Sequence, residues 1–169
     1  VVLSEYKNEV VPVELRDGEN SKNKEKIAKI AASYIADGDT VFLDSSSTAR
    51  RILKYIRGKK SIRIITNNVR VLAELEGSDV TVYLTGGKYS DKRECLIGRM
   101  AEEQIMTVYA DKFFFSARAV SAWGEITDIS EDEIGLRRMM LKNSRKSYFL
   151  CDSSKLDSVS SFHLFDVEE

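Results

Sequence analysis

Four short polar motifs in the sequence each follow directly after an apolar run with the composition of a β-strand. They are Asp44-Ser45-Ser46-Ser47-Thr48, Thr66-Asn67-Asn68, Gly86-Gly87-Lys88 and Asp152-Ser153-Ser154-Lys155. In an open parallel sheet, the loops that leave the carboxyl ends of the strands lie along one rim, and ligands bind there near helix N-termini. The pattern therefore predicts one cavity that binds a phosphorylated small molecule.

The first two motifs have an ordinary structural alternative. Serine, threonine, aspartate and asparagine are the preferred residues for capping a helix N-terminus, and both motifs precede a predicted helix. A cap needs only one such residue, so the run from Asp44 to Thr48 favours an additional role in binding an anion. The asparagines of the second motif fit either role.

The glycine motif allows the backbone to approach a ligand closely, although paired glycines also form turns. The spacing of a phosphate loop of NTPases and the three spaced glycines of a dinucleotide site are both absent from the sequence. Nucleotide binding is therefore disfavoured.

Lys155 of the fourth motif and two further residues, Arg118 and Glu133, could contribute chemistry to the rim. Lys155 could give a phosphate a point charge, and Arg118 could bind it with two hydrogen bonds. A surface lysine in a turn and an arginine paired with a carboxylate are the alternatives. Glu133 lies three residues after Ser130, which is the spacing of a capping box, so a structural role competes with a role in the site.

Composition limits the function further. The chain has 169 residues, 43% of them hydrophobic, and a formal charge of -1 with a pI near 6.0. This size predicts a single domain spanning 1–169, and the charge argues against direct DNA binding by this segment. Cys95 and Cys151 lack disulfide or zinc spacing, and the single histidine, His163, predicts no metal cluster. We expect a cytoplasmic protein without a cofactor.

The periodicity of apolar residues predicts alternating strands and helices. Ile27, Ile30, Ala31, Tyr34 and Ile35 recur at helical spacing, and the run 40–43 is apolar on both faces, as in a strand covered on both sides. The same reading predicts helices over 22–37, 47–57, 68–76, 99–107 and 131–143, and strands over 40–43, 62–65, 80–84, 112–115 and 147–151. The fold class is α/β, with a mostly parallel sheet and helices on both faces. Val10, Val11 and Val13 around Pro12 predict an edge strand, and 88–94 and 121–130 are predicted to be polar loops.

The ordered motifs resemble the C-terminal effector-sensing domain of DeoR-type bacterial transcription regulators. The resemblance rests on Ile27-Ala28, Asp37-Gly38-Asp39-Thr40, Asp44-Ser45, Thr66-Asn67, Gly86-Gly87, Ile97-Gly98, Asp111-Lys112, Gly124, Glu133, Met140 and Asp152-Ser153-Ser154-Lys155. It implies a sheet similar to that of ribose-5-phosphate isomerase, glucosamine-6-phosphate deaminase and CoA transferases. It also implies a preceding helix-turn-helix domain, through which alone DNA would be bound, a further strand after the end of this chain, and a homo-oligomer.

The sequence departs from the family pattern at two places. Ser46 and Ser47 stand where the family usually has glycine and threonine, and Ser116, Ala117 and Ala119 stand where glycines are common. The leading hypothesis is a regulator domain, not an enzyme, whose rim binds a phosphorylated sugar. Its predicted effector-binding residues are Asp44, Ser45, Ser46, Ser47, Thr48, Thr66, Asn67, Asn68, Gly86, Gly87, Lys88, Arg118, Glu133, Asp152 and Lys155. The alternative is a sugar-phosphate isomerase with Glu133 as its general base.

Overall fold

A computed structural model describes residues 5–6 and 13–167 of the chain. Val10, Val11 and Pro12 of the predicted edge strand lie outside these residues. Val13 is the first residue of helix α1 (Val13–Gly18), so the prediction that it belongs to a strand is wrong.

Five parallel strands form the central sheet and confirm the α/β class. In chain order they are β2 (Thr40–Leu43), β3 (Arg63–Thr66), β4 (Thr81–Leu84), β7 (Ala110–Phe115) and β10 (Ser144–Phe149). Their spatial order is β10-β7-β2-β3-β4, so the chain runs outward from β2 in one direction and then crosses back to β7. The reversal of strand order beside β2 is where α/β sheets bind their ligands.

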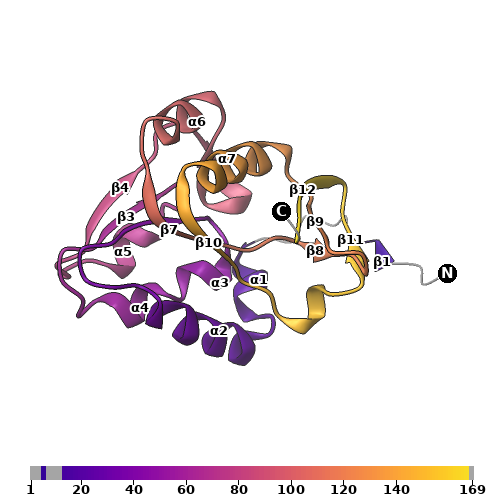
Figure 1. Cartoon of the computed structure of the whole chain (residues 1–169), viewed down its shortest axis with the longest axis horizontal. Helices are drawn as coiled ribbons and strands as arrows, with labels where there is room; N and C mark the ends of the chain where they lie inside the picture. The colour runs from indigo at the N-terminus through magenta and orange to yellow at the C-terminus, as the bar shows by residue number, and fades with distance from the viewer. Residues whose placement is uncertain (1–4, 7–12, 168–169) are drawn as a thin grey trace.

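Helices cover both faces of this sheet (Figure 1). Val41 and Leu43 face a core formed with α2 (Ser21–Ser33), α3 (Ser47–Arg50), α4 (Leu53–Ile56) and α5 (Val71–Glu74). Phe42 faces the opposite core, which is covered by α6 (Arg99–Ile105) and α7 (Glu131–Lys142). In that core, the rings of Phe113 and Phe115 stack with centroids 4.7 Å apart. Successive residues of β2 therefore point alternately into the two hydrophobic cores, as expected for a strand covered on both sides.

In the described part of the chain, seven further strands lie outside the central sheet. The strands β8 (Ala119–Val120), β9 (Glu125–Asp128) and β12 (Phe162–Asp166) form an antiparallel sheet, and β5 (Lys88–Ser90) and β6 (Cys95–Ile97) form a hairpin. The strand β1 (Glu5–Tyr6) pairs in parallel with β11 (Ser158–Val159). The segments 88–94 and 121–130, which the sequence predicts to be loops, therefore contain β5 and β9.

Two predicted helices are shorter than their apolar patterns suggest. The pattern over 47–57 divides into α3 and α4, because Ile52 and Tyr55 donate to carbonyls three residues earlier and interrupt the α-helical ladder. The pattern over 68–76 contains only α5, because the Asn68 side chain accepts from the Arg70 amide and forms a turn before the helix. Local side-chain hydrogen bonds of this kind compete with a helical start.

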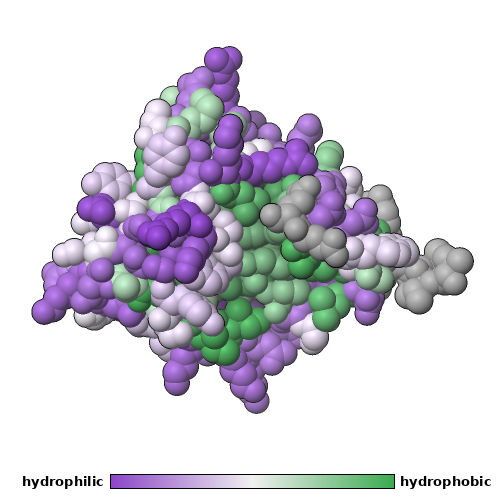
Figure 2. Space-filling view, viewed as in Figure 1, coloured by the Kyte–Doolittle hydropathy of each residue, from purple (hydrophilic) through white to green (hydrophobic). Residues whose placement is uncertain are grey.

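The surface combines a central apolar area with charged projections. Hydrophobic residues gather near the middle of the face in Figure 2, and hydrophilic side chains project around it. In the described part of the chain, no helix has the length and apolar character needed to cross a membrane.

Candidate functional site

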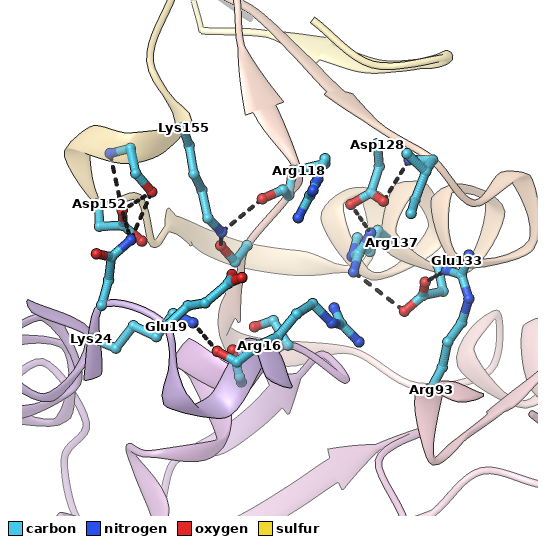
Figure 3. Close-up of a pocket in the computed structure, with 17 residues that line it drawn as sticks. Arg16, Glu19, Lys24, Arg93, Arg118, Asp128, Glu133, Arg137, Asp152 and Lys155 are labelled. Carbon is cyan, nitrogen blue, oxygen red and sulfur yellow. Dashed lines mark hydrogen bonds and ion pairs between the residues drawn. The ribbon is translucent and has the colours of Figure 1, made fainter. Parts of the chain in front are cut away.

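A cavity of about 500 Å³ opens at the carboxyl ends of β2, β7 and β10 (Figure 3). Its other wall comes from α1 and the start of α2. It is lined by Arg16, Glu19, Asn20, Lys24, Ser46, Ser47, Arg93, Ser116, Ala117, Arg118, Asp128, Ile129, Glu133, Arg137, Asp152, Ser154 and Lys155. Six of these side chains are cationic and four are carboxylates, so the lining carries a net positive charge.

Arg137 organises one end of the cavity. Its Nε lies 3.0 Å from Asp44 Oδ2, its Nη1 lies 2.9 Å from Asp128 Oδ2, and its Nη2 lies 3.5 Å from Glu133 Oε1. The residue is only 4% exposed. Burial by itself lowers the pKa of Arg137, but the charges of Asp128 and Asp44 outweigh it and raise the pKa overall. One buried guanidinium therefore fixes three carboxylates.

Glu133 is fixed from three directions. Its Oε1 accepts a hydrogen bond of 2.6 Å from Ser45 Oγ, and its Oε2 forms an ion pair with Arg93. Its backbone amide donates to Ser130 Oγ at 3.4 Å, so Ser130 caps α7 as predicted. Both carboxylate oxygens of Glu133 are thus engaged before a ligand enters, which disfavours a role as a general base.

Lys155 points into the opposite end of the cavity. Its Nζ donates to Ser116 Oγ at 2.5 Å and to the Ala117 carbonyl at 2.7 Å. Burial lowers the pKa of Lys155 to about 8. Its two partners are neutral, and no carboxylate oxygen lies within ion-pair distance of Nζ among the described residues, so its charge is available to an anion.

Arg16 and Arg118 also lack ion-pair partners in the described part of the chain. The Nε atom of each is buried and makes no hydrogen bond. Burial lowers the pKa of Arg16. Buried guanidinium donors without acceptors are costly, and a bound oxyanion would satisfy them.

In the motif from Asp44 to Thr48, only Ser46 and Ser47 line the cavity. Asp44 lies beneath, where Oδ1 accepts from the Ser46 amide and Oδ2 accepts from the Ser116 amide and from Arg137. Ser46 Oγ accepts from the Ala49 amide at 3.2 Å and caps α3. Asp44, which the sequence predicts to bind the effector, does not line the cavity and is only 2% exposed.

The second motif lies away from the cavity. Thr66 Oγ1 donates to the Leu43 carbonyl at 2.6 Å, and the Asn67 side chain donates to the Leu96 carbonyl at 3.1 Å. Asn68 forms a bridge with Cys95. Thr66 thus bonds to β2, whereas Asn67 and Asn68 hold the β5–β6 hairpin, which carries Arg93, against the end of β3.

The glycine motif is also outside the cavity. The Gly86 amide donates to Gln104 Oε1 at 2.6 Å, and Lys88 is exposed on β5. Gly87 has φ +119°, and a Cβ there would lie 2.6 Å from the Ile97 carbonyl oxygen. The glycine is therefore required by the hairpin. A single cavity shared by all four motifs is thus contradicted, and only those around 44–48 and 152–155 meet.

Several lining residues were not predicted from the sequence. The largest missed group comes from α1 and α2, namely Arg16, Glu19, Asn20 and Lys24, and the others are Arg93, Ser116, Ala117, Asp128, Ile129, Arg137 and Ser154. Two of them carried a local signal, because Arg137 lies one helical turn after Glu133 and Ser154 lies within the motif 152–155. In the described part of the chain, no group of three or more histidine, cysteine, aspartate or glutamate side chains could hold a metal ion.

The sequence of residues 19–169 matches the model of the DeoR C terminal sensor domain. The chain belongs to this family. It is 32% identical over 152 residues to the HTH-type transcriptional repressor GlcR of Bacillus subtilis, covering 88% of this chain and 57% of that protein. It is 33% identical over 141 residues to the lactose phosphotransferase system repressor of Lactococcus lactis, covering 82% of this chain and 55% of that protein.

Among solved structures, ribose 5-phosphate isomerase A of Methanocaldococcus jannaschii has a similar fold, with a TM-score of 0.58. At 16% identity, the alignment covers 82% of this chain and 55% of the isomerase chain. This likeness confirms the predicted isomerase-like sheet and carries no conclusion about activity. The relatives are transcriptional regulators, so the chain is a DeoR-type effector-sensing domain and not an enzyme. The chain spans somewhat more than half the length of these relatives.

Proposed function

We propose that this domain senses a phosphorylated sugar or a closely related metabolite in the cavity at the ends of β2, β7 and β10. The observation that carries the proposal is the set of three cationic side chains, Arg16, Arg118 and Lys155, that face the cavity without a carboxylate partner among the described residues. The excess of two cationic side chains in the lining equals the charge of a phosphate monoester dianion.

The two ends of the cavity suit the two ends of such a ligand. The phosphate lies among Arg16, Arg118 and Lys155, where guanidinium forks match its oxygens. The sugar extends toward Asp128 and Glu133, which line the cavity and whose carboxylate oxygens keep lone pairs for hydroxyl donors beyond their bonds to Arg137. Ser46 and Ser47 border the space between the two ends. Asp152 stays a proposed site residue, because its side chain lines the cavity.

A matched set of compounds tests this assignment. Thermal unfolding and calorimetry are measured with pentose and hexose phosphates, with the corresponding free sugars, and with inorganic phosphate. We expect phosphorylated compounds to raise the melting temperature by mass action and free sugars to have no effect. Arg118→Gln should weaken binding of the best compound, whereas Arg99→Gln, on an exposed side chain of α6, should not. Equal binding of free sugars, or no stabilisation by any phosphorylated compound, would refute the proposal.

We further propose that a helix-turn-helix domain precedes this chain in the whole protein and makes the DNA contacts. Two relatives are named as repressors, and the chain spans only 57% of one and 55% of the other. Its formal charge of -1 fits a domain that does not bind DNA itself. A homo-oligomer in the cytoplasm, acting as a repressor, completes the proposal. Gel-shift measurements on the whole protein, with and without the best ligand, would show whether ligand and DNA binding are coupled.

A further inference from the structure

We propose that α1 and the turn after it, residues 13–20, dock against the domain in a manner that depends on the ligand. We name these residues the α1 segment. The inference rests on the proposed function, because the anion that Arg16 binds is the effector. It adds which part of the molecule responds to the effector, and it states that effector binding favours docking of that part.

The α1 segment contributes little to the hydrophobic core. Among its side chains that the structure describes, those of residues 15–20, none belongs to either buried hydrophobic cluster, and Leu15 is 63% exposed. A helix of six residues is also too short to be stable by itself. Its position therefore depends on polar contacts, which is the mark of a segment with low local stability.

Two sets of contacts hold the segment to different parts of the domain. Asp17 pairs with Arg50 of α3 and, at 2.8 Å, with Arg70 before α5. The Asn20 side chain donates to Asp152 Oδ1 at 3.3 Å and to Ser154 Oγ at 2.9 Å. The second set reaches the turn that carries Lys155, so both sides of the anion site are connected through the segment.

Arg16 lies between these attachments and faces the cavity (Figure 3). It brings a third cation without an ion-pair partner among the described residues toward Arg118 and Lys155. Attraction by Asp128 exceeds repulsion by Arg137 at this guanidinium, so the penalty for docking is its burial with Nε unbonded. Without a ligand, this penalty opposes docking of the α1 segment. An oxyanion removes it, so the ligand binds the docked state more tightly and shifts the population toward it.

Hydrogen exchange measured by mass spectrometry tests the inference. Amide exchange is followed in the 169-residue chain, alone and with inorganic phosphate or the best sugar phosphate as the probe. We expect residues 13–20 to exchange much faster than β2 and β7 without the probe, and at least about fivefold more slowly with it. Arg16→Gln should abolish most of this slowing, and Arg99→Gln should leave it unchanged.

A ligand-free variant provides a second, independent readout. Asp17→Asn removes the ion pairs to Arg50 and Arg70 and should speed exchange in the α1 segment without changing exchange in β2 and β7. Anion binding without slower exchange in residues 13–20 would overturn the inference and leave the proposed function intact. If no anion binds at all, the proposed function fails and this inference fails with it. Exchange in residues 13–20 as slow as in β2 without any ligand would also overturn it.

Discussion

The two halves of the sheet rim begin from similar polar motifs and end with different roles. At the ends of β2, β7 and β10, the motifs around residues 44–48 and 152–155 border a cavity. At the ends of β3 and β4, Thr66, Asn67 and Gly86 bond to neighbouring segments of the protein itself. The difference comes from β6 and α6, because Leu96 of β6 accepts from Asn67 and Gln104 of α6 accepts from Gly86. Polar residues at a strand end thus border an open cavity only where no other part of the chain reaches them.

The largest expected effect on stability comes from removing Arg137, the cation shared by three carboxylates in the half of the rim that borders the cavity. Arg137→Met leaves Asp44, Asp128 and Glu133 buried without their shared partner. Breaking a buried ionic cluster in this way costs roughly 3–5 kcal/mol of unfolding free energy. Urea unfolding measures the loss.

The control for Arg137→Met is Arg138→Met, one residue later on α7. Arg138 is exposed and donates only to backbone carbonyls of His163 and Leu164. We expect its loss to cost about 1 kcal/mol or less. Similar losses of unfolding free energy for the two variants would show that Arg137 does not stabilise the three buried carboxylates.

The second prediction compares two lysines, one from each half of the rim. Lys155 faces the cavity and Lys88 is exposed on the hairpin. Lys155→Met should weaken binding of the best sugar phosphate by about 1.5–3 kcal/mol, roughly tenfold to a hundredfold, because a charged hydrogen bond is lost. Lys88→Met should leave calorimetric affinity unchanged. An equal loss of affinity in both variants would mean that Lys88 on the β5–β6 hairpin also takes part in binding.

Sequence reasoning recovered the parallel sheet because its signals are local. The apolar runs 40–43 and 80–84 predict β2 and β4 within a residue. Strands of two or three residues such as β5, β6 and β8 were missed, since they are too short to show alternation. Their existence depends on pairing with distant segments, which a single sequence does not display.

The site was recovered only in part for a related reason. Lys155, Arg118 and Glu133 follow strands or begin a helix, so topology alone places them near the rim. Arg16 comes from a helix about a hundred residues earlier than Arg118 in the chain, and its direction depends on how α1 docks. Thr66 and Gly87 look like site residues in the sequence because the same hydroxyls and glycines that bind ligands also close turns.

The third prediction concerns the pH dependence of binding. Burial lowers the pKa of Lys155 to about 8, whereas the second ionisation of a phosphate monoester is complete near pH 7. Above pH 8 the free site loses its lysine proton while the ligand charge stays constant, so affinity should fall by up to about tenfold per pH unit. Calorimetry of the wild type between pH 7 and 9.5 measures this slope. Lys155→Met should show a much flatter profile, and a flat profile in the wild type would exclude an ionic role for Lys155.

The same pKa has a consequence for stability. Because the pKa of Lys155 is lowered in the folded state, the unfolded chain binds the extra proton between about pH 8 and the ordinary lysine pKa of 10.5. Stability of the wild type relative to Lys155→Met should therefore rise with pH in this window and not change below it. Unfolding free energies of both proteins at pH 7.5 and 9.5 give the comparison.

The smallest expected effect distinguishes helix capping from ligand binding at Ser46, in the half of the rim that borders the cavity. Ser46 lines the cavity, yet its Oγ already accepts from the Ala49 amide and caps α3. If capping is its main role, Ser46→Ala should cost about 1 kcal/mol of unfolding free energy and Ser46→Gly only a few tenths, because glycine is nearly as good at this position. Ligand affinity should change less than threefold in both variants, against roughly tenfold or more for Lys155→Met. A large loss of affinity with little loss of stability would instead make the Ser46 hydroxyl a ligand contact, and the serine in place of the usual family glycine would then affect which effector is bound.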